Sequence, residues 1–321
     1  MITTYKIDSR GFLVKSDKPI SEAAWIDVVM PTPEEYALLE GEIDVRLPQH
    51  HEMLQIEYSS RFYEEENALC LSAFVIAKVA PIPDSHAISL IVTANKLVTM
   101  RFFELNPYKS FIQQLTLHPR SPSDHFDILI LLLDALAGRV ADIFETFEEK
   151  TELLGFGLNG AMHGIKRTKN STLLNETLHE IIELENLLSK CYQSLSSLQL
   201  LVGFFQQGYE KHFKDNISNR LVTLKQDIKG MIKHGEFLNQ KLEFQLESTL
   251  GLINIEQTHI IKTFTVLAMI FMPPTLIASI YGMNFRYIPE LNLHFGYPLA
   301  MGIMIVSSVF PYLFFKRKGW L

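Results

Sequence analysis

Residues 263–284 read TFTVLAMIFMPPTLIASIYGMN, and this stretch decides the fold class. Its first 19 residues, Thr263–Tyr281, carry no charge, and a second uncharged run of 21 residues, Phe295–Phe315, follows it after a short connection. A helix needs about 20 apolar residues to cross the ~30 Å hydrocarbon core of a bilayer. Two such runs so close together would form an unusual hairpin in a soluble protein. We therefore expect two transmembrane helices.

Basic residues set the expected orientation of these spans. Lys316, Arg317 and Lys318 directly follow the second run. Because positive residues stay on the cytoplasmic side, the C-terminus is expected in the cytoplasm. Two spans then return the N-terminal part to the cytoplasm and place the connecting loop, residues 282–294, outside. The stretch Met1–Asp8 has no apolar core, so no cleaved signal peptide is predicted.

The composition and charge of the chain exclude several classes of protein. Apolar residues make up 47% and charged residues 20% of the 321, which excludes disorder and a coiled coil alone. Residues 1–261 hold 24 basic and 35 acidic residues, a net charge of −11, which argues against a nucleic-acid partner. Cys70 and Cys191 are the two cysteines and lie far apart in sequence, so a disulfide scaffold is excluded and both are expected to be reduced.

Residues 1–122 are expected to form a mixed α/β domain. Apolar runs rich in Ile, Val, Phe and Thr predict strands, and short helices are expected to begin at prolines. A tight hairpin turn is predicted at Ala94–Lys96. The expected strands are Trp25–Met30, Leu54–Tyr58, Ala68–Val79, Ile88–Ala94 and Leu97–Phe103, and the expected helices are Pro33–Leu39 and Pro107–Leu117.

From Ser123 to Met272 there is no proline, which predicts long helices. The glycine-rich stretch 155–164 is expected to break the first, the second is expected over Leu173–Leu201, and the third from near Gly208 to Tyr281. A continuous third helix would have about 74 residues and a length of about 110 Å, which suggests that several chains assemble around it. The predicted divisions are a cytosolic helical hairpin (123–207), a stalk helix (208–259), a first span (260–281), the external loop (282–294), a second span (295–315) and a basic tail (316–321).

Two motifs suggest chemistry that their context does not support. Gly155–Gly160 fits the pattern GxGxxG, but a helix precedes it where the dinucleotide fingerprint requires a strand, so a loop between helices is expected. His50, His51 and Glu52 could ligate a metal, yet adjacent side chains point apart, and a solvated turn is expected. With no catalytic constellation visible, an enzyme is the least favoured class.

The first span carries polar groups on one side. At 100° per residue, one stripe within an arc of about 100° gathers small, hydroxylated and flexible side chains. It contains Ile261, Phe264, Thr265, Ala268, Met272, Thr275 and Ser279, whereas Val266, Ile270 and Ile277 point elsewhere. Helix packing through small residues and the lining of a pore both explain this periodicity.

The end of this span resembles the CorA-type magnesium channels, whose signature is Gly-Met-Asn after the first of two C-terminal spans. Here the signature is Gly282-Met283-Asn284. The neighbouring features that are also similar are Pro273-Pro274-Thr275, Pro289-Glu290-Leu291, Phe295–Pro298, the stalk segment Ile253–Gln257 and the basic tail that ends in Trp320-Leu321.

The resemblance implies a homopentamer with five copies of the first span around one pore, below which a funnel of stalk helices extends. Asn284 would accept hydrogen bonds from the waters of hydrated Mg²⁺, with the Gly282 carbonyl beside it, while Met283 packs. Thr275 and Ser279 are implied as further pore contacts, and Met272, Phe264 and Ile261 as an apolar gate. Glu290 would concentrate cations at the outer mouth. Thr258 stands where many relatives have asparagine, and Ser279 where many have glycine.

The family resemblance also implies function and location. It implies influx of Mg²⁺, with Co²⁺ or Ni²⁺ as further ions, across a bacterial inner membrane, and closure by intracellular Mg²⁺ bound between protomers. Asp227 is a candidate regulatory ligand and Asp84 a weaker one, against the alternative of a solvated acidic face. The competing hypotheses are the zinc-transporting branch that shares Gly-Met-Asn, which generally lacks the Pro-Glu-Leu loop, and a two-span sensor that does not conduct.

Overall fold

The fold was analysed in a computed structural model of the chain. It describes residues 1–8, 11–16, 20–55, 57–65, 68–79, 82–104, 108, 111–113, 115, 122–162, 170–209, 215–284, 286, 288–289 and 294–320, with the backbone alone at 78, 158–162, 170–171 and 215–216. The chain divides into an N-terminal unit, Met1–Gly157 with Thr177–Gln245, and a C-terminal unit, Leu158–Glu176 with Leu246–Leu321.

The N-terminal unit begins with a mixed seven-stranded sheet in the order β2-β1-β3-β7-β6-β5-β4. Neighbouring strands are antiparallel except for β3 and β7, which run parallel. The strands are β1 (Ile2–Ile7), β2 (Leu13–Ser16), β3 (Trp25–Val29), β4 (Phe62–Glu65), β5 (Ala68–Lys78), β6 (Asp84–Thr93) and β7 (Leu97–Arg101). The short helices around them are η1 (Ile20–Glu22), α1 (Pro33–Ile43), α2 (His50–Met53) and α3 (Tyr58–Arg61).

Local sequence explains the start of α1 and the turn between β6 and β7. Thr32 caps α1, because its hydroxyl accepts a bond from the Glu35 amide at 3.2 Å while the Glu35 carboxylate accepts one from the Thr32 amide at 2.9 Å. Pro33 then occupies a first-turn position, where its missing N–H costs nothing. At the turn, the Thr93 amide donates to the Lys96 carbonyl at 3.0 Å, as the predicted hairpin requires.

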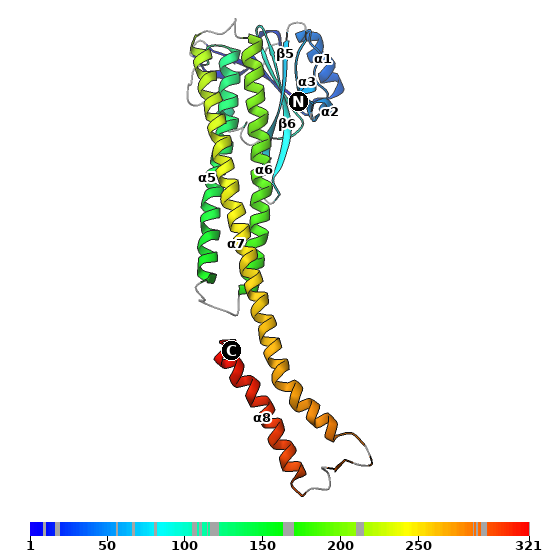
Figure 1. The fold of residues 1–321 in the computed structure, drawn as a ribbon. Helices are drawn as coiled ribbons and strands as arrows, with labels where there is room; N and C mark the ends of the chain where they lie inside the picture. Colours follow the sequence, from blue (N-terminus) through cyan, green and yellow to red (C-terminus); the bar gives the residue numbers. More distant parts are fainter. Residues whose placement is uncertain are drawn as a thin grey trace. The chain divides into compact units, whose positions relative to one another are not determined.

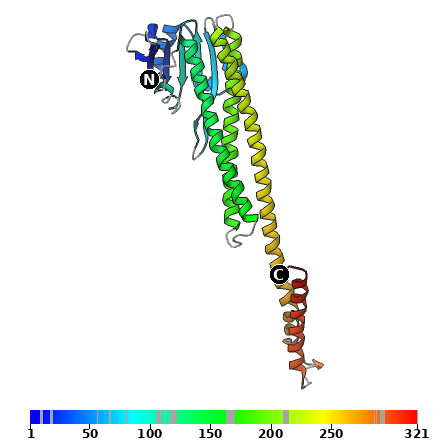
Figure 2. The same cartoon turned by 90° about the vertical axis from the view of Figure 1, so that its left-hand side faces the viewer.

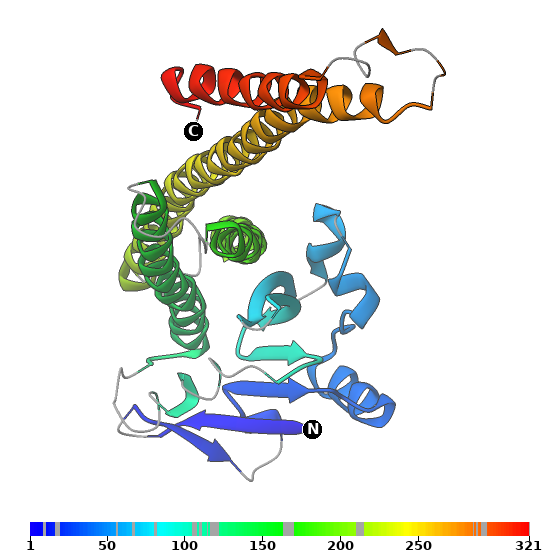
Figure 3. The same cartoon turned by 90° about the horizontal axis from the view of Figure 1, so that it is seen from below.

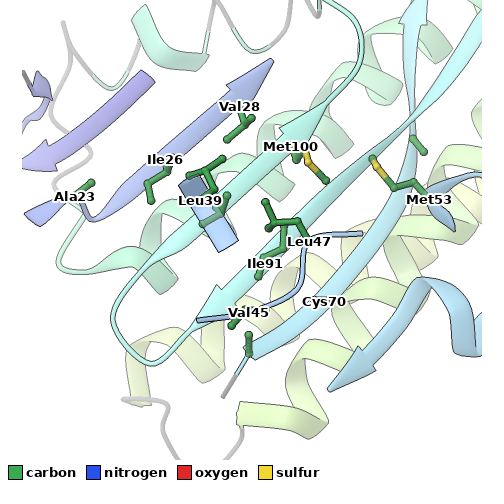
Figure 4. Close-up of a cluster of buried hydrophobic side chains, with 13 residues drawn as sticks. Ala23, Ile26, Val28, Leu39, Val45, Leu47, Met53, Cys70, Ile91 and Met100 are labelled. Atoms are coloured by element: carbon green, nitrogen blue, oxygen red, sulfur yellow. The ribbon is translucent and has the colours of Figure 1, made fainter. Parts of the chain in front are cut away.

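Apolar side chains cover one face of the sheet. Ile26, Ile91 and Met100 from the strands meet Leu39 of α1 and Leu47 of the following segment, all fully buried (Figure 4). Helix α6 packs on the sheet through Ser197, whose hydroxyl accepts a bond from the Phe74 amide at 2.8 Å. This arrangement gives both faces of the sheet a packing partner.

A buried polar chain joins the parallel strands β3 and β7. Asp27 and Arg101 form an ion pair, and the Thr99 hydroxyl donates to the Asp27 carboxylate at 2.8 Å. The Trp25 ring N–H donates in turn to the Thr99 hydroxyl at 3.1 Å. Because each charge has a partner, the strands can bury it.

Three long helices follow: α5 (His125–Met162), α6 (Asn170–Tyr209) and α7 (Asp215–Tyr281), the last with 67 residues. Within the N-terminal unit they run alongside one another (Figures 1 and 2), and Figure 3 views α6 end-on beside α5. The Arg220 guanidinium donates to Asp127 at 2.9 Å, and the Gln245 amide donates to the Thr151 carbonyl at 2.6 Å. These two contacts hold α7 against α5.

Several expectations need correction. Leu54–Tyr58 is not a strand, because α2 ends just before it and α3 begins at Tyr58. Glycines 155–160 do not form the expected loop, because α5 continues through them. The break expected within 155–164 lies near the end of that stretch, since α5 ends at Met162 and residues 163–164 lie outside the described residues. The stalk helix does not start near Gly208, which lies in the last turn of α6; α7 starts at Asp215. His50–Glu52 forms the short helix α2 rather than a turn, since Glu52 accepts from the Gln49 amide at 2.7 Å and pairs with Arg46.

Other expectations are confirmed within a few residues. Strands β3, β5, β6 and β7 lie where their apolar runs predict them, and the two apolar C-terminal helices are present. Strands β1, β2 and β4 were not predicted. The described positions of the expected helix at 107–117, namely 108, 111–113 and 115, are helical, and its remaining positions lie outside the described residues. Both cysteines are free and buried, and burial raises the pKa of Cys70 to about 11 and that of Cys191 to about 12.

Candidate ion pathway

Two helices of the chain have the length and composition of membrane spans: the last part of α7 and α8 (Gly296–Arg317). In the most apolar 18-residue stretch of each helix, only 6% for α7 and 11% for α8 is buried within the chain. A core helix of a soluble protein would be mostly buried, so these apolar surfaces must be covered by something outside the chain. In Figure 1, α8 runs back antiparallel to the end of α7.

One face of α7 packs against α8. Val266 on this face is 1% exposed. The Ile270 carbonyl lacks its normal helical donor four residues later, because that residue is Pro274, which has no N–H. The Ser308 hydroxyl of α8 donates to this carbonyl at 3.3 Å. An unpaired carbonyl is costly in hydrocarbon, so α8 stabilises the proline-containing segment at the point where its own hydrogen bonding fails.

The predicted polar stripe lies on the opposite face of α7. At 100° per residue, Val266 and Ile270 stand roughly 140–180° from Thr275. The proposed gate side chains Ile261, Phe264 and Met272 are 65%, 67% and 68% exposed, and Thr275 and Ser279 are exposed as well. The stripe is therefore not used for packing within the chain. Met272 stands at its border, because it also lines a groove against Phe310 and Phe314.

Threonine hydroxyls along α7 bond back to the helix. Thr258, Thr265 and Thr275 each donate to the carbonyl four residues earlier, at 2.8, 2.8 and 2.7 Å. This bond satisfies the hydroxyl proton within an apolar helix. The oxygen lone pairs remain as acceptors, so these hydroxyls can receive hydrogen bonds from water.

Helix α7 ends at the Gly-Met-Asn motif. The Gly282 amide donates to the Ala278 carbonyl at 2.9 Å, and a Cβ at Gly282 would lie 3.2 Å from that oxygen. Glycine thus lets the chain leave the helix without crowding the final turn. Asn284 follows outside the helix and is exposed, and Met283 is 49% exposed. Glu290 lies outside the described residues.

The acidic candidates belong to the N-terminal unit, whereas the motif belongs to the C-terminal unit. Asp227 is exposed on α7 within the N-terminal unit. Asp84, at the start of β6, lies 3.0 Å from Nε2 of His86. Among the residues that the structure describes, no three His, Cys, Asp or Glu side chains gather to hold a metal.

Comparison with known proteins gives the family. Residues 21–317 match the family described as CorA-like Mg²⁺ transporter protein. The chain belongs to this CorA-like family. It is 31% identical over 325 residues to the magnesium transport protein CorA of Haemophilus influenzae and 30% identical over 332 residues to that of Escherichia coli, in each case over the full length of both proteins.

The fold agrees with this membership. The complete structure of the CorA magnesium transporter from Methanocaldococcus jannaschii matches with a TM-score of 0.78 and 20% identity, over 100% of this chain and 99% of that one. The α/β domain, the long helix and the C-terminal apolar helix are thus the fold of a CorA-like membrane transporter, and the chain is not an enzyme.

Proposed function

We propose that this chain forms a homopentameric channel that carries hydrated Mg²⁺, with Co²⁺ or Ni²⁺ as further ions, into the cell. The observation that best supports the proposal is that two opposite faces of α7 have different surroundings. Its Val266–Ile270 face meets α8, while the opposite stripe of Ile261, Phe264, Thr275 and Ser279 is left exposed. Five copies around a symmetry axis would bury that stripe in a shared pore.

The residue types suit a hydrated magnesium ion. Mg²⁺ binds water tightly and gives it up reluctantly. A ring of five Asn284 side chains, supported by the Gly282 carbonyls, would hold the ion through its waters rather than strip them. Conduction requires such weak binding at several sites. Thr275 suits a next contact, because its hydroxyl proton is already donated to the Phe271 carbonyl and its oxygen is left to accept.

The apolar members of the stripe suit a gate. Ile261 and Phe264 present large apolar surfaces on the pore-facing stripe, and five copies of each could exclude water by dewetting. Met272 would contribute to the same constriction from the border of the stripe. Outside the membrane, five copies of Glu290 would raise the local cation concentration.

The orientation and the closure of the channel complete the proposal. Lys316–Lys318 follow the second span, which favours N- and C-termini in the cytoplasm of a bacterium and insertion in its inner membrane. The net charge of −11 over residues 1–261 would repel between five protomers. Intracellular Mg²⁺ bound between protomers would relieve this repulsion and favour the closed state, with Asp227 as a candidate ligand and Asp84 as a weaker one.

The deciding experiment substitutes the proposed filter. Asn284→Ala should abolish Mg²⁺ uptake into proteoliposomes while the purified protein keeps the mass of a pentamer. The reason is that the proposed role of this side chain is to contact the ion and not to stabilise the fold. Asn239→Ala is the matched control, since Asn239 is a half-buried asparagine of α7 whose side-chain amide donates to Glu243 at 2.7 Å. Uptake at the unsubstituted rate in Asn284→Ala would contradict the filter assignment. The same assay, run with Zn²⁺ and an imposed proton gradient, distinguishes a zinc transporter from a magnesium channel.

A further inference from the structure

Two apolar grooves run between α7 and α8 in the C-terminal unit. One has a volume of about 690 Å³ and lies toward Pro298, and the other has about 400 Å³ and ends at Phe315. They share Pro273, Phe310 and Pro311, so they form one furrow along the helix pair. The α8 residues 298–315 that line it span about 26 Å of helix, more than one leaflet of the ~30 Å hydrocarbon core.

The furrow ends at a cluster of aromatic and cationic side chains. Two of its lining residues, Phe314 and Phe315, carry this cluster. The Lys318 ammonium lies 5.2 Å from the ring centroid of Phe314, and Trp320 stacks on Phe315 at 5.4 Å. The Lys262 ammonium of α7 lies 5.8 Å from the Trp320 ring centroid.

The spacing on α7 places Lys262 on the side that faces the furrow. Lys262, Val266, Met269 and Pro273 follow one another by three or four residues, the spacing of one helix face. Met269 and Pro273 line the groove. Two cations from different helices therefore converge where the apolar furrow ends.

We infer that this furrow and its cationic end bind one anionic phospholipid, with an acyl chain in the furrow and the headgroup phosphate at Lys262 and Lys318. Charge selects this occupant. From Lys262 to the end of the chain there are five basic residues and one acidic residue, and Glu290, the acidic one, lies beyond the far ends of both spans. The one acidic side chain in this part of the sequence is therefore 28 residues away from either lysine in sequence. A ring such as that of Trp320 favours the membrane–water interface, where a headgroup lies.

The inference depends only on insertion of the two spans and holds whichever ion the protein carries. Trp320 supplies a probe, because the other tryptophan, Trp25, is fully buried in the sheet and gives an unquenched background. The full-length protein is reconstituted in phosphatidylcholine that contains one tenth brominated phosphatidylglycerol. A parallel sample contains one tenth brominated phosphatidylcholine instead. Bromine on the acyl chains quenches tryptophan fluorescence at short range.

We expect brominated phosphatidylglycerol to quench Trp320 at least twice as strongly as brominated phosphatidylcholine. Each lysine near an anionic lipid enriches it by on the order of fivefold. The double variant Lys262→Gln/Lys318→Gln should therefore bring the ratio close to one, whereas Arg286→Gln, which removes an exposed cation from the loop between the spans, should leave it unchanged. Equal quenching by both lipids in the unsubstituted protein would overturn the inference. Strong and equal quenching would mean that the furrow binds lipid without selecting its charge, and weak and equal quenching would mean that another copy of the chain covers the furrow.

A second variant tests the furrow itself. Gly302 lines it, and a Cβ there would meet nothing within 4 Å. Gly302→Leu should therefore fill the furrow without disturbing the helix and should lower quenching by brominated phosphatidylglycerol. Val309→Leu enlarges an exposed α8 residue that does not line either groove and should have no effect. Unchanged quenching in Gly302→Leu would show that the acyl chain lies elsewhere.

Discussion

Helix α7 packs closely against two neighbouring helices at Gly235, and this contact can be tested by enlarging the residue. A Cβ at Gly235 would lie 3.1 Å from Cζ of Phe144 on α5 and 3.2 Å from Cζ of Tyr192 on α6. These distances are shorter than ordinary van der Waals contact. The absence of a side chain therefore lets three helices meet at one point. We predict that Gly235→Leu forces α7 away from both rings and destabilises the N-terminal unit.

The magnitude follows from comparison with Gly230, five residues earlier on the same helix. A Cβ at Gly230 would meet nothing within 4 Å. Gly230→Leu should therefore show only the helix-propensity gain of about 0.5–1 kcal/mol. The same gain at Gly235 is opposed by overpacking, which costs about 1–3 kcal/mol and more where the backbone must shift. Because the gain is the same in both variants, they should differ by the overpacking cost, about 1–3 kcal/mol in the free energy of unfolding.

Thermal unfolding of the full-length protein in detergent, followed by far-ultraviolet circular dichroism, measures this difference. A change of 1 kcal/mol shifts Tm by about 2–4 °C in a domain of 150–250 residues. Gly235→Leu should therefore unfold at a temperature about 2–12 °C below Gly230→Leu. Fluorescence of Trp25 should report the same order, because that ring is buried in the N-terminal unit. Equal Tm values for the two variants would refute the close packing of α7 on Phe144 and Tyr192.

Two further predictions concern pH and magnesium. Burial lowers the pKa of His125, whose Nε2 lies 3.1 Å from the Thr93 carbonyl, below its usual value near 6.5. The unfolded chain therefore takes up the proton first as the pH falls through about 6.5, and stability decreases until the pH passes below the folded pKa. The decrease in Tm between pH 7.5 and pH 5.5 should therefore be smaller in His125→Gln than in the control variant His179→Gln, which changes an exposed histidine. Equal decreases in the two variants would exclude His125 as the cause. Proteolysis within residues 123–260 should rise when Mg²⁺ is chelated and fall when it is restored, and a digestion pattern that does not respond to millimolar Mg²⁺ would remove the regulatory role proposed for the acidic surface.

The strands that the sequence predicts are those in the middle of the sheet. Strand β6 holds six consecutive buried residues, Ala87–Val92, and β7 is buried throughout, so both appear as mostly apolar runs. Strands β1, β2 and β4 are only partly buried, and none contains an apolar run longer than two residues. Burial by neighbouring strands supplies the stability that local sequence does not indicate.

Two of the wrong expectations for local structure have different causes. Leu54–Tyr58 alternates apolar and polar residues as a strand does, but Leu54 and Tyr58 are each 44% exposed, so no sheet surface receives the apolar side. Glycines 155–160 reduce helix propensity, yet α5 continues through them. A Cβ at Gly155 would lie 3.3 Å from the Gln245 side chain, and Leu154 beside it is buried. Packing against α7 thus outweighs propensity.

The candidate pathway shows what periodicity can and cannot decide. The sequence places Ile261, Phe264, Thr275 and Ser279 on one face of a span, but pore lining and helix packing predict the same pattern. The position of α8 shows which face packs within the chain, because the bond from Ser308 to the Ile270 carbonyl lies on the face opposite the stripe. Nothing in the sequence of α8 alone indicates that bond. Pro274 of α7 removes the amide that would normally donate to the Ile270 carbonyl. A hydroxyl able to reach a carbonyl that a proline leaves unpaired is the signal that would have predicted this bond.

The same bond constrains how helix α7 can move. A proline pair permits a helix to bend, since two backbone hydrogen bonds are absent at Pro273 and Pro274. Here the bend point carries an interhelical hydrogen bond on the α8 side and the Thr275 back-bond one residue further on. Both contacts involve carbonyls of the same turn, those of Ile270 and Phe271. Any motion that opens the stripe near Met272 by bending at the prolines must therefore carry α8 with it or break the Ser308 bond, so the two spans are expected to move as a pair.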